Sequence, residues 1–122
     1  MDELVERLTA TVGIDKAVAE KAVGSILEFL QKEGPAAPVQ ALIEELPGAD
    51  ALIAAADENG GGFGGLLGGG LMALGSKLMG FGLGMSDIQS VARELFKFGR
   101  EKIGKERMDE IVSGTPGLSQ FA

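Results

Sequence analysis

The sequence contains no cysteine, histidine, tyrosine or tryptophan. Without cysteine the chain forms no disulfide and offers no thiolate nucleophile. Histidine is the commonest general base near neutral pH, and histidine and cysteine are the usual ligands of zinc and redox metals. These absences exclude the familiar nucleophile arrangements and leave only carboxylate sites for hard cations open. We therefore expect neither an enzyme nor a protein with a metal or another cofactor.

Positive charge is scarce as well. The chain has 11 Lys and Arg against 18 Asp and Glu, a formal net charge of −7, which disfavours nucleic acid as a partner because phosphates select basic surfaces. Residues 1–58 hold 12 acidic and 4 basic side chains (net −8), whereas residues 59–122 hold 6 acidic and 7 basic ones (net +1). The two halves therefore attract each other, but only weakly, because salt screens exposed charges.

The N-terminus does not have the pattern of a secretory signal. It reads Met-Asp-Glu-Leu-Val-Glu-Arg, which is acidic and amphipathic. A secretory signal begins with positive charge and continues with an apolar run of about 7–15 residues. We therefore expect the protein in the cytoplasm.

What the sequence does contain is a helical pattern. Hydrophobic residues make up 45% of the 122 residues, enough for one domain to bury a core. They recur at intervals of three and four residues, the period of an amphipathic α-helix. This spacing predicts helices over residues 2–12, 16–32, 38–46, 50–56, 71–81, 87–102 and 105–113. The expected fold is an all-α single domain, residues 1–122, of six to seven helices.

Capping residues mark several helix ends. Asp15 is a good N-cap for the second helix. Gly34 precedes a proline at the end of that helix, and we expect this glycine to adopt the left-handed cap conformation. Residues 86–89 read Ser-Asp-Ile-Gln, which matches the capping box S-x-x-Q and predicts Ser86 as the N-cap of the helix that follows.

Residues 59–70 form a glycine-rich connector, Asn-Gly-Gly-Gly-Phe-Gly-Gly-Leu-Leu-Gly-Gly-Gly. Each glycine costs a helix about 1 kcal/mol relative to alanine, so the connector is either a linker or a helix held by tight packing. It contains G-x-G-x-x-G, but no strand precedes it, and a dinucleotide site is not expected. The segment is apolar and has G-x-x-x-G spacing, which leaves contact with a membrane or with another chain open. The candidate contact residues in it are Gly61, Phe63, Gly65, Leu66, Leu67 and Gly69.

The chain also shows an internal repeat. With a shift of 69 positions, residues 12–53 align with residues 81–122 without a gap, and most apolar positions and a Pro-Gly turn coincide. This predicts two pseudo-symmetric three-helix units, about 1–56 and 71–122, on either side of the connector. Each unit is too small for a good core, so we expect the two to pack face to face as one domain.

Two phenylalanines occupy matching places in the repeat. Phe29 and Phe98 each lie one residue beyond the main apolar stripe of their helix. One interpretation is that they widen the apolar face and pack inside the protein. The other is that they are exposed aromatic anchors for a partner helix.

The order of these segments resembles small bacterial all-helical proteins of families known only as domains of unknown function, the VcgC/VcgE-like proteins among them. The resemblance rests on short segments spread over nearly the whole chain: Val-Gly-Ile-Asp at 12–15, Leu-Pro-Gly-Ala at 46–49, the glycine-leucine run, Gly-Leu-Gly-Met at 82–85 and Pro-Gly-Leu-Ser-Gln-Phe at 116–121. It implies no activity, cofactor or catalytic residue.

The leading hypothesis is a non-enzymatic helical module that binds a protein partner or a second copy of itself as a homodimer. Its contact surface would be the side of Phe29 and Phe98 or the glycine-rich segment. A first alternative is contact with a membrane or lipid through residues 60–84, and a second is a small-ligand binder with its site between the two units.

Overall fold

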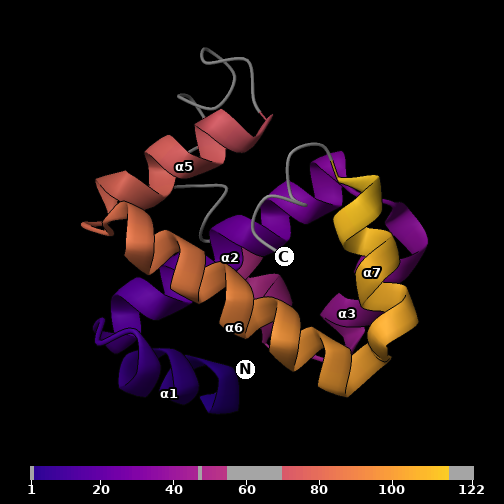
Figure 1. The fold of residues 1–122 in the computed structure, drawn as a ribbon, viewed down its shortest axis with the longest axis horizontal. Helices are drawn as coiled ribbons and strands as arrows, with labels where there is room; N and C mark the ends of the chain where they lie inside the picture. The colour runs from indigo at the N-terminus through magenta and orange to yellow at the C-terminus, as the bar shows by residue number, and fades with distance from the viewer. Residues whose placement is uncertain (1, 47, 55–69, 116–122) are drawn as a thin grey trace.

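Helices form where apolar residues recur at helical spacing. The computed structural model describes residues 2–46, 48–54 and 70–115 of the chain, and these contain helices and no strand (Figure 1). The helices are α1 (Asp2–Thr11), α2 (Lys16–Glu33), α3 (Ala36–Glu44), α5 (Gly70–Gly80), α6 (Met85–Ile103) and α7 (Lys105–Gly114). Residues 49–54 are helical as well. The prediction of an all-α single domain is confirmed.

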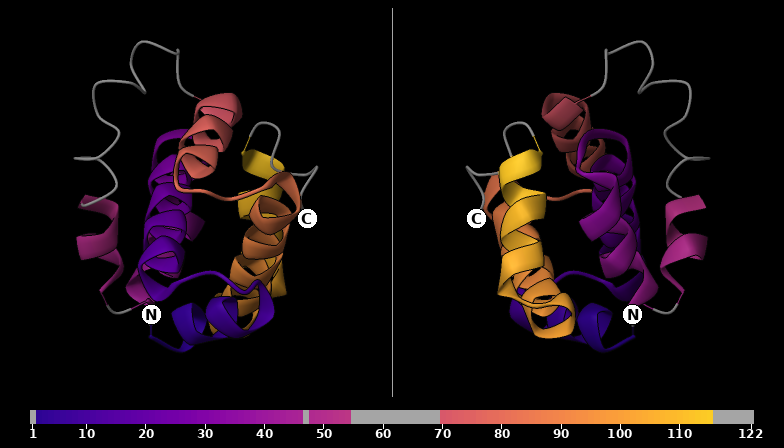
Figure 2. Two further views of the ribbon diagram at one scale, coloured as in Figure 1. Left: turned by 90° about the vertical axis from the view of Figure 1, so that its left-hand side faces the viewer. Right: turned by 90° about the vertical axis from the view of Figure 1, so that its right-hand side faces the viewer.

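The long helices α2 and α6 form the centre of the bundle, where they pack on each other. Figures 1 and 2 show α1 and α5 at opposite edges, with α2 and α6 between them, and residues 49–54 on the outer side of α2. The shorter helices α3 and α7 pack on each other and on α6. The largest fully buried side chains come from all six of these helices and include Leu4, Leu8, Leu27, Leu30, Leu42, Leu78, Leu95, Phe96, Met108 and Ile111.

Two expectations about helix ends are wrong. Gly34 is extended, with φ −94°, and does not adopt the left-handed conformation. It is needed for space, because a Cβ at this position would lie 2.8 Å from the Thr115 Oγ1 atom. Ser86 is not the N-cap of α6: the helix begins at Met85, and Gly84 is its N-cap. The carboxylate of Asp87 accepts a hydrogen bond from the Gly84 N–H (3.2 Å) and so takes the N3 role that the sequence assigned to Gln89.

The helix bounds recur with the shift of the predicted repeat. Moved by 69 positions, the bounds of α1, α2 and α3 fall within one residue of those of α5, α6 and α7. The turns that follow α1 and α5 each contain a glycine with positive φ, Gly13 at 82° and Gly82 at 93°. The contacts also correspond, since α1 packs on α2 and α6, and α5 does the same. The pseudo-symmetry of the two units stays a prediction that these correspondences favour.

Candidate functional site

The two phenylalanines singled out in the sequence lie in the core. Phe29 is 7% exposed and Phe98 is 2% exposed. Both belong to the main hydrophobic cluster, as the packing interpretation expects. The exposed-anchor interpretation does not fit this fold, because neither ring presents a surface that a partner helix could cover.

The other sequence candidates cannot be compared in this way. Gly61, Phe63, Gly65, Leu66, Leu67 and Gly69 all lie outside the described residues. The glycine-rich connector therefore stays a candidate on the evidence of its sequence alone.

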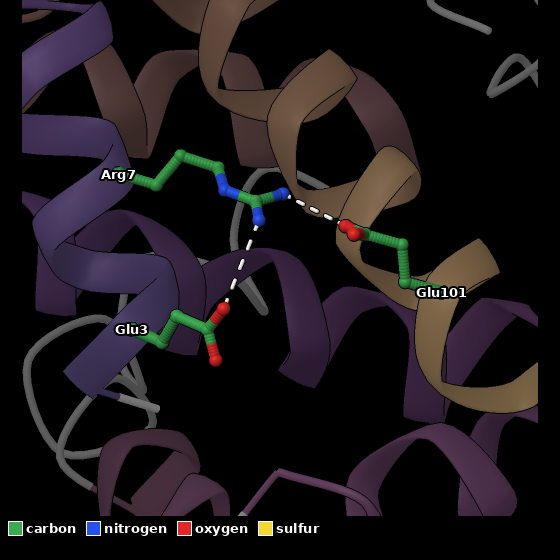
Figure 3. Close-up of polar contacts among 3 residues, drawn as sticks. All are labelled: Glu3, Arg7 and Glu101. Carbon is green, nitrogen blue, oxygen red and sulfur yellow. Dashed lines mark hydrogen bonds and ion pairs between the residues drawn. The ribbon is translucent and has the colours of Figure 1, made fainter.

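A charged cluster joins α1 to α6 (Figure 3). Arg7 of α1 donates a hydrogen bond to the Glu101 carboxylate of α6, with an Nη1–Oε2 distance of 2.9 Å. A second carboxylate, that of Glu3, lies 3.9 Å from the Arg7 Nη2 atom. The guanidinium also lies over the ring of Phe98, 5.4 Å from its centroid, and the Lys102 Nζ atom is 5.2 Å from the same centroid.

The electrostatics of this cluster hold both partners in their charged forms. The hydrogen bond from Arg7, together with its positive charge, lowers the pKa of Glu101 below the ordinary value of 4.5. The same hydrogen bond raises the pKa of Arg7. A general acid or base needs a pKa near the working pH, and these shifts move both groups away from it. The cluster therefore joins α1 to α6 through a charged pair.

The exposed apolar surface lies elsewhere, at the turn between α5 and α6. Met79 is 50% exposed and Met85 is 56% exposed, and among the described residues these are the large hydrophobic side chains that face solvent. Between them, Phe81 is half-buried and has the Lys21 Nζ atom 5.7 Å from its ring centroid. We call Met79, Phe81 and Met85 the methionine corner.

The backbone of this corner is open on its outer side but anchored beneath. A Cβ built on Gly80 or on Gly82 meets nothing within 4 Å. Leu78 and Leu83, on either side of these glycines, are 1% and 4% exposed. The corner therefore presents flexible apolar side chains on a backbone that is fixed to the core.

Sequence reasoning missed both methionines. Met79 directly follows the helical row of Leu74 and Leu78, and Met85 follows Gly84 at the start of a helix. Each therefore reads as part of a helix that packs in the core. The available signal was that Met79 lies off this row and Met85 off the stripe of the next helix, so neither position points inward.

The described residues offer no metal site: residues 2–46, 48–54 and 70–115 contain no group of three or more acidic side chains that could hold an ion. Within the same ranges, none of the helices is both long and apolar enough to cross a bilayer. No family model, curated protein or solved structure matches this chain.

Proposed function

We propose that this chain is a non-catalytic protein-interaction module whose contact surface is the methionine corner. The observation that carries the proposal is the exposure of Met79 and Met85, at 50% and 56%, at one turn of a domain whose other large apolar side chains are covered. That comparison is limited to the part of the chain that the structure describes.

The physical chemistry of methionine supports a contact role. Removing apolar surface from water is worth roughly 25 cal/mol per Å², so two half-exposed methionines gain free energy when a partner covers them. The side chain is unbranched and polarisable, and it adapts to surfaces of different shape. Phe81 adds an aromatic ring beside them, and aromatic residues are enriched among those that dominate binding energy.

The charged groups support a structural role for the rest of the molecule. Arg7 and Glu101 fasten α1 to α6, and Lys77 of α5 lies 3.8 Å from the Glu28 carboxylate of α2. Both pairs join two helices. Such pairs set the positions of helices, whereas catalysis needs reactive groups that converge on a substrate.

Site-specific photo-crosslinking in cells tests the proposal. A benzophenone amino acid replaces Met79 in one full-length variant and Glu110 in a control variant. Glu110 is an exposed residue of α7, and Figure 1 shows α7 on the opposite side of the bundle from the turn between α5 and α6. We expect a discrete protein adduct from position 79 that is absent from position 110 and is lost when Met85→Lys is added.

Adducts of equal yield from both positions, or from neither, would contradict the proposal. The mass of the adduct separates the two kinds of partner, because twice the mass of the chain identifies a second copy. Co-sedimentation of purified protein with lipid vesicles, lost in Met79→Lys, would favour the membrane alternative for residues 60–84 over a protein partner.

A further inference from the structure

The glycines of α5 differ in kind from those of the central helices. In α2, a Cβ on Gly24 would lie 2.8 Å from the carbonyl carbon of Leu52, and in α6 a Cβ on Gly99 would lie 2.5 Å from the Met108 Sδ atom. Close packing requires glycine at position 24, where the neighbour is backbone, whereas at position 99 the neighbour is the flexible end of the Met108 side chain. In α5, a Cβ on Gly75 or Gly80 meets no atom of the described residues within 4 Å. These glycines weaken the helix without allowing any close approach that would offset their cost.

The face of α2 that α5 covers is polar. Lys77 of α5 pairs with Glu28 of α2, and Phe81 lies beneath Lys21 of α2. Since residue numbers rise along α5 as they fall along α2, the two helices run antiparallel. Residues 21, 25, 28 and 32 are spaced for one helix face. Ser25 and Glu28 are covered in the middle of this face, whereas Lys21 and Lys32 at its two ends are exposed. We call Lys21, Ser25, Glu28 and Lys32 the polar row of α2.

Two oxygen atoms in this row are buried without a hydrogen bond. The Ser25 hydroxyl and the Oε2 atom of Glu28 have no hydrogen-bond partner among the described residues. Ser25 is only 2% exposed. Burying a polar atom without a hydrogen bond is unfavourable, and exposure to water removes that penalty. The Glu28 Oε2 atom has the Lys77 Nζ atom 3.8 Å away as an ion-pair partner, so the penalty falls mainly on the Ser25 hydroxyl. At Ser25 the interface is therefore less favourable than an apolar contact of the same size.

The position of α5 allows it to separate from the rest. It lies at one edge of the bundle, where its main contacts are with α2, and α1, α3 and α7 lie away from it (Figure 1). The turn at its C-terminal end contains Gly82, which has a φ of 93°, and a Cβ built on this glycine meets no described atom within 4 Å. No side-chain packing at Gly82 would therefore oppose a change in the direction of the turn. Among the described residues of α5 with side chains placed, only Leu74 and Leu78 are buried in the core.

We propose that α5 detaches from α2 as a unit while the other helices remain folded, and that its detachment uncovers Ser25 and Glu28 in the middle of the polar row. The proposal goes beyond the interaction module and does not depend on it. In the closed conformation α5 covers Ser25 and Glu28, and in the open conformation both side chains contact solvent.

Native-state hydrogen exchange of the full chain, read residue by residue by NMR, tests the proposal. We expect protection of the α5 amides of residues 75–80 to be at least about 30-fold lower than that of the central amides of α2 and α6, with a weaker dependence on urea. Equal protection and equal urea dependence in all three helices would overturn the proposal, because α5 would then open only by global unfolding.

Two variants separate local opening from global unfolding. Ile111→Val removes one methylene from α7, which packs on α3 and α6, and it should lower the protection of the slowest α2 amides about 5-fold. If α5 opens on its own, its protection stays unchanged in Ile111→Val; a matching 5-fold fall would overturn the proposal. Gly75→Ala strengthens α5 itself and should raise the protection of its amides about 5-fold.

Discussion

The same substitution, glycine to alanine, should have opposite effects in α2 and in α5. Gly24 and Gly75 both lie inside helices, where alanine is intrinsically favoured by about 1 kcal/mol. They differ in surroundings. The new Cβ at position 24 would collide with the backbone carbonyl of Leu52, whereas at position 75 it would meet open space.

The magnitudes follow from these contacts. Overpacking a fitted site costs about 1–3 kcal/mol, and the collision at position 24 is with backbone, which moves only if the helix of residues 49–54 shifts away from α2. After the gain in helix propensity is subtracted, Gly24→Ala should destabilise the protein by about 1–2 kcal/mol. Gly75→Ala should stabilise it by about 0.5–1 kcal/mol, because nothing opposes the propensity term.

Urea unfolding followed by circular dichroism at the helical band measures both changes on the full chain. The midpoint should fall for Gly24→Ala and rise for Gly75→Ala, and thermal midpoints should shift by about 3–6 °C per kcal/mol in the same directions. Shifts of the same sign in both variants, or a Gly24→Ala protein as stable as the parent, would refute the reasoning from glycine packing.

Two further predictions concern helix attachment and helix capping. Because the pKa of Glu101 is lowered in the folded state, the stability contributed by its bond to Arg7 is fully present above the ordinary pKa of 4.5 and is lost as the pH falls through the lower folded value. The parent should therefore lose more stability on acidification than the Glu101→Gln variant. Parallel pH profiles of the urea unfolding midpoint in the two proteins would count against this. Asp87→Ala removes the acceptor for the Gly84 N–H and should lower the free energy of unfolding in urea by about 0.5–1 kcal/mol, whereas Ser86→Ala should stay within about 0.5 kcal/mol of the parent. A larger loss of stability in Ser86→Ala than in Asp87→Ala would instead support Ser86 as the N-cap.

Helix positions could be predicted from the sequence because apolar periodicity is a local signal. The row of Val91, Leu95 and their neighbours identifies the buried face of α6 without any knowledge of its partners. Asp15 was predicted as the N-cap of α2 on the same local grounds, and it holds that position, although its side chain makes no capping hydrogen bond with the described residues.

Features that depend on which helices meet could not be predicted. A Cβ on Gly34 would lie 2.7 Å from the Leu30 carbonyl oxygen and 2.8 Å from the Thr115 Oγ1 atom, and no local rule for helix caps includes the second, distant contact. The start of α6 at Met85, with Gly84 as its N-cap in place of Ser86, follows a turn that contains Gly82 and the buried Leu83.

Which side chains are exposed could not be settled from the sequence for a related reason. An aromatic residue off a stripe can pack in the core or serve as an anchor, and the burial of Phe98 beneath Arg7 of α1 favours packing. Methionines inside helices look like core residues, yet the turn between α5 and α6 turns Met79 and Met85 outward. Exposure is a property of the assembled bundle, and the sequence of one helix does not contain it.

The exposure of the methionine corner is the claim on which the proposed function rests, and one measurement tests it directly. The full chain, labelled with ¹³C in the methionine methyl groups, is titrated with a soluble paramagnetic agent and followed by NMR. The account predicts strong broadening of the Met79 and Met85 methyl signals and little effect on Met108, which is 0% exposed. Equal protection of all three methyl groups would contradict it.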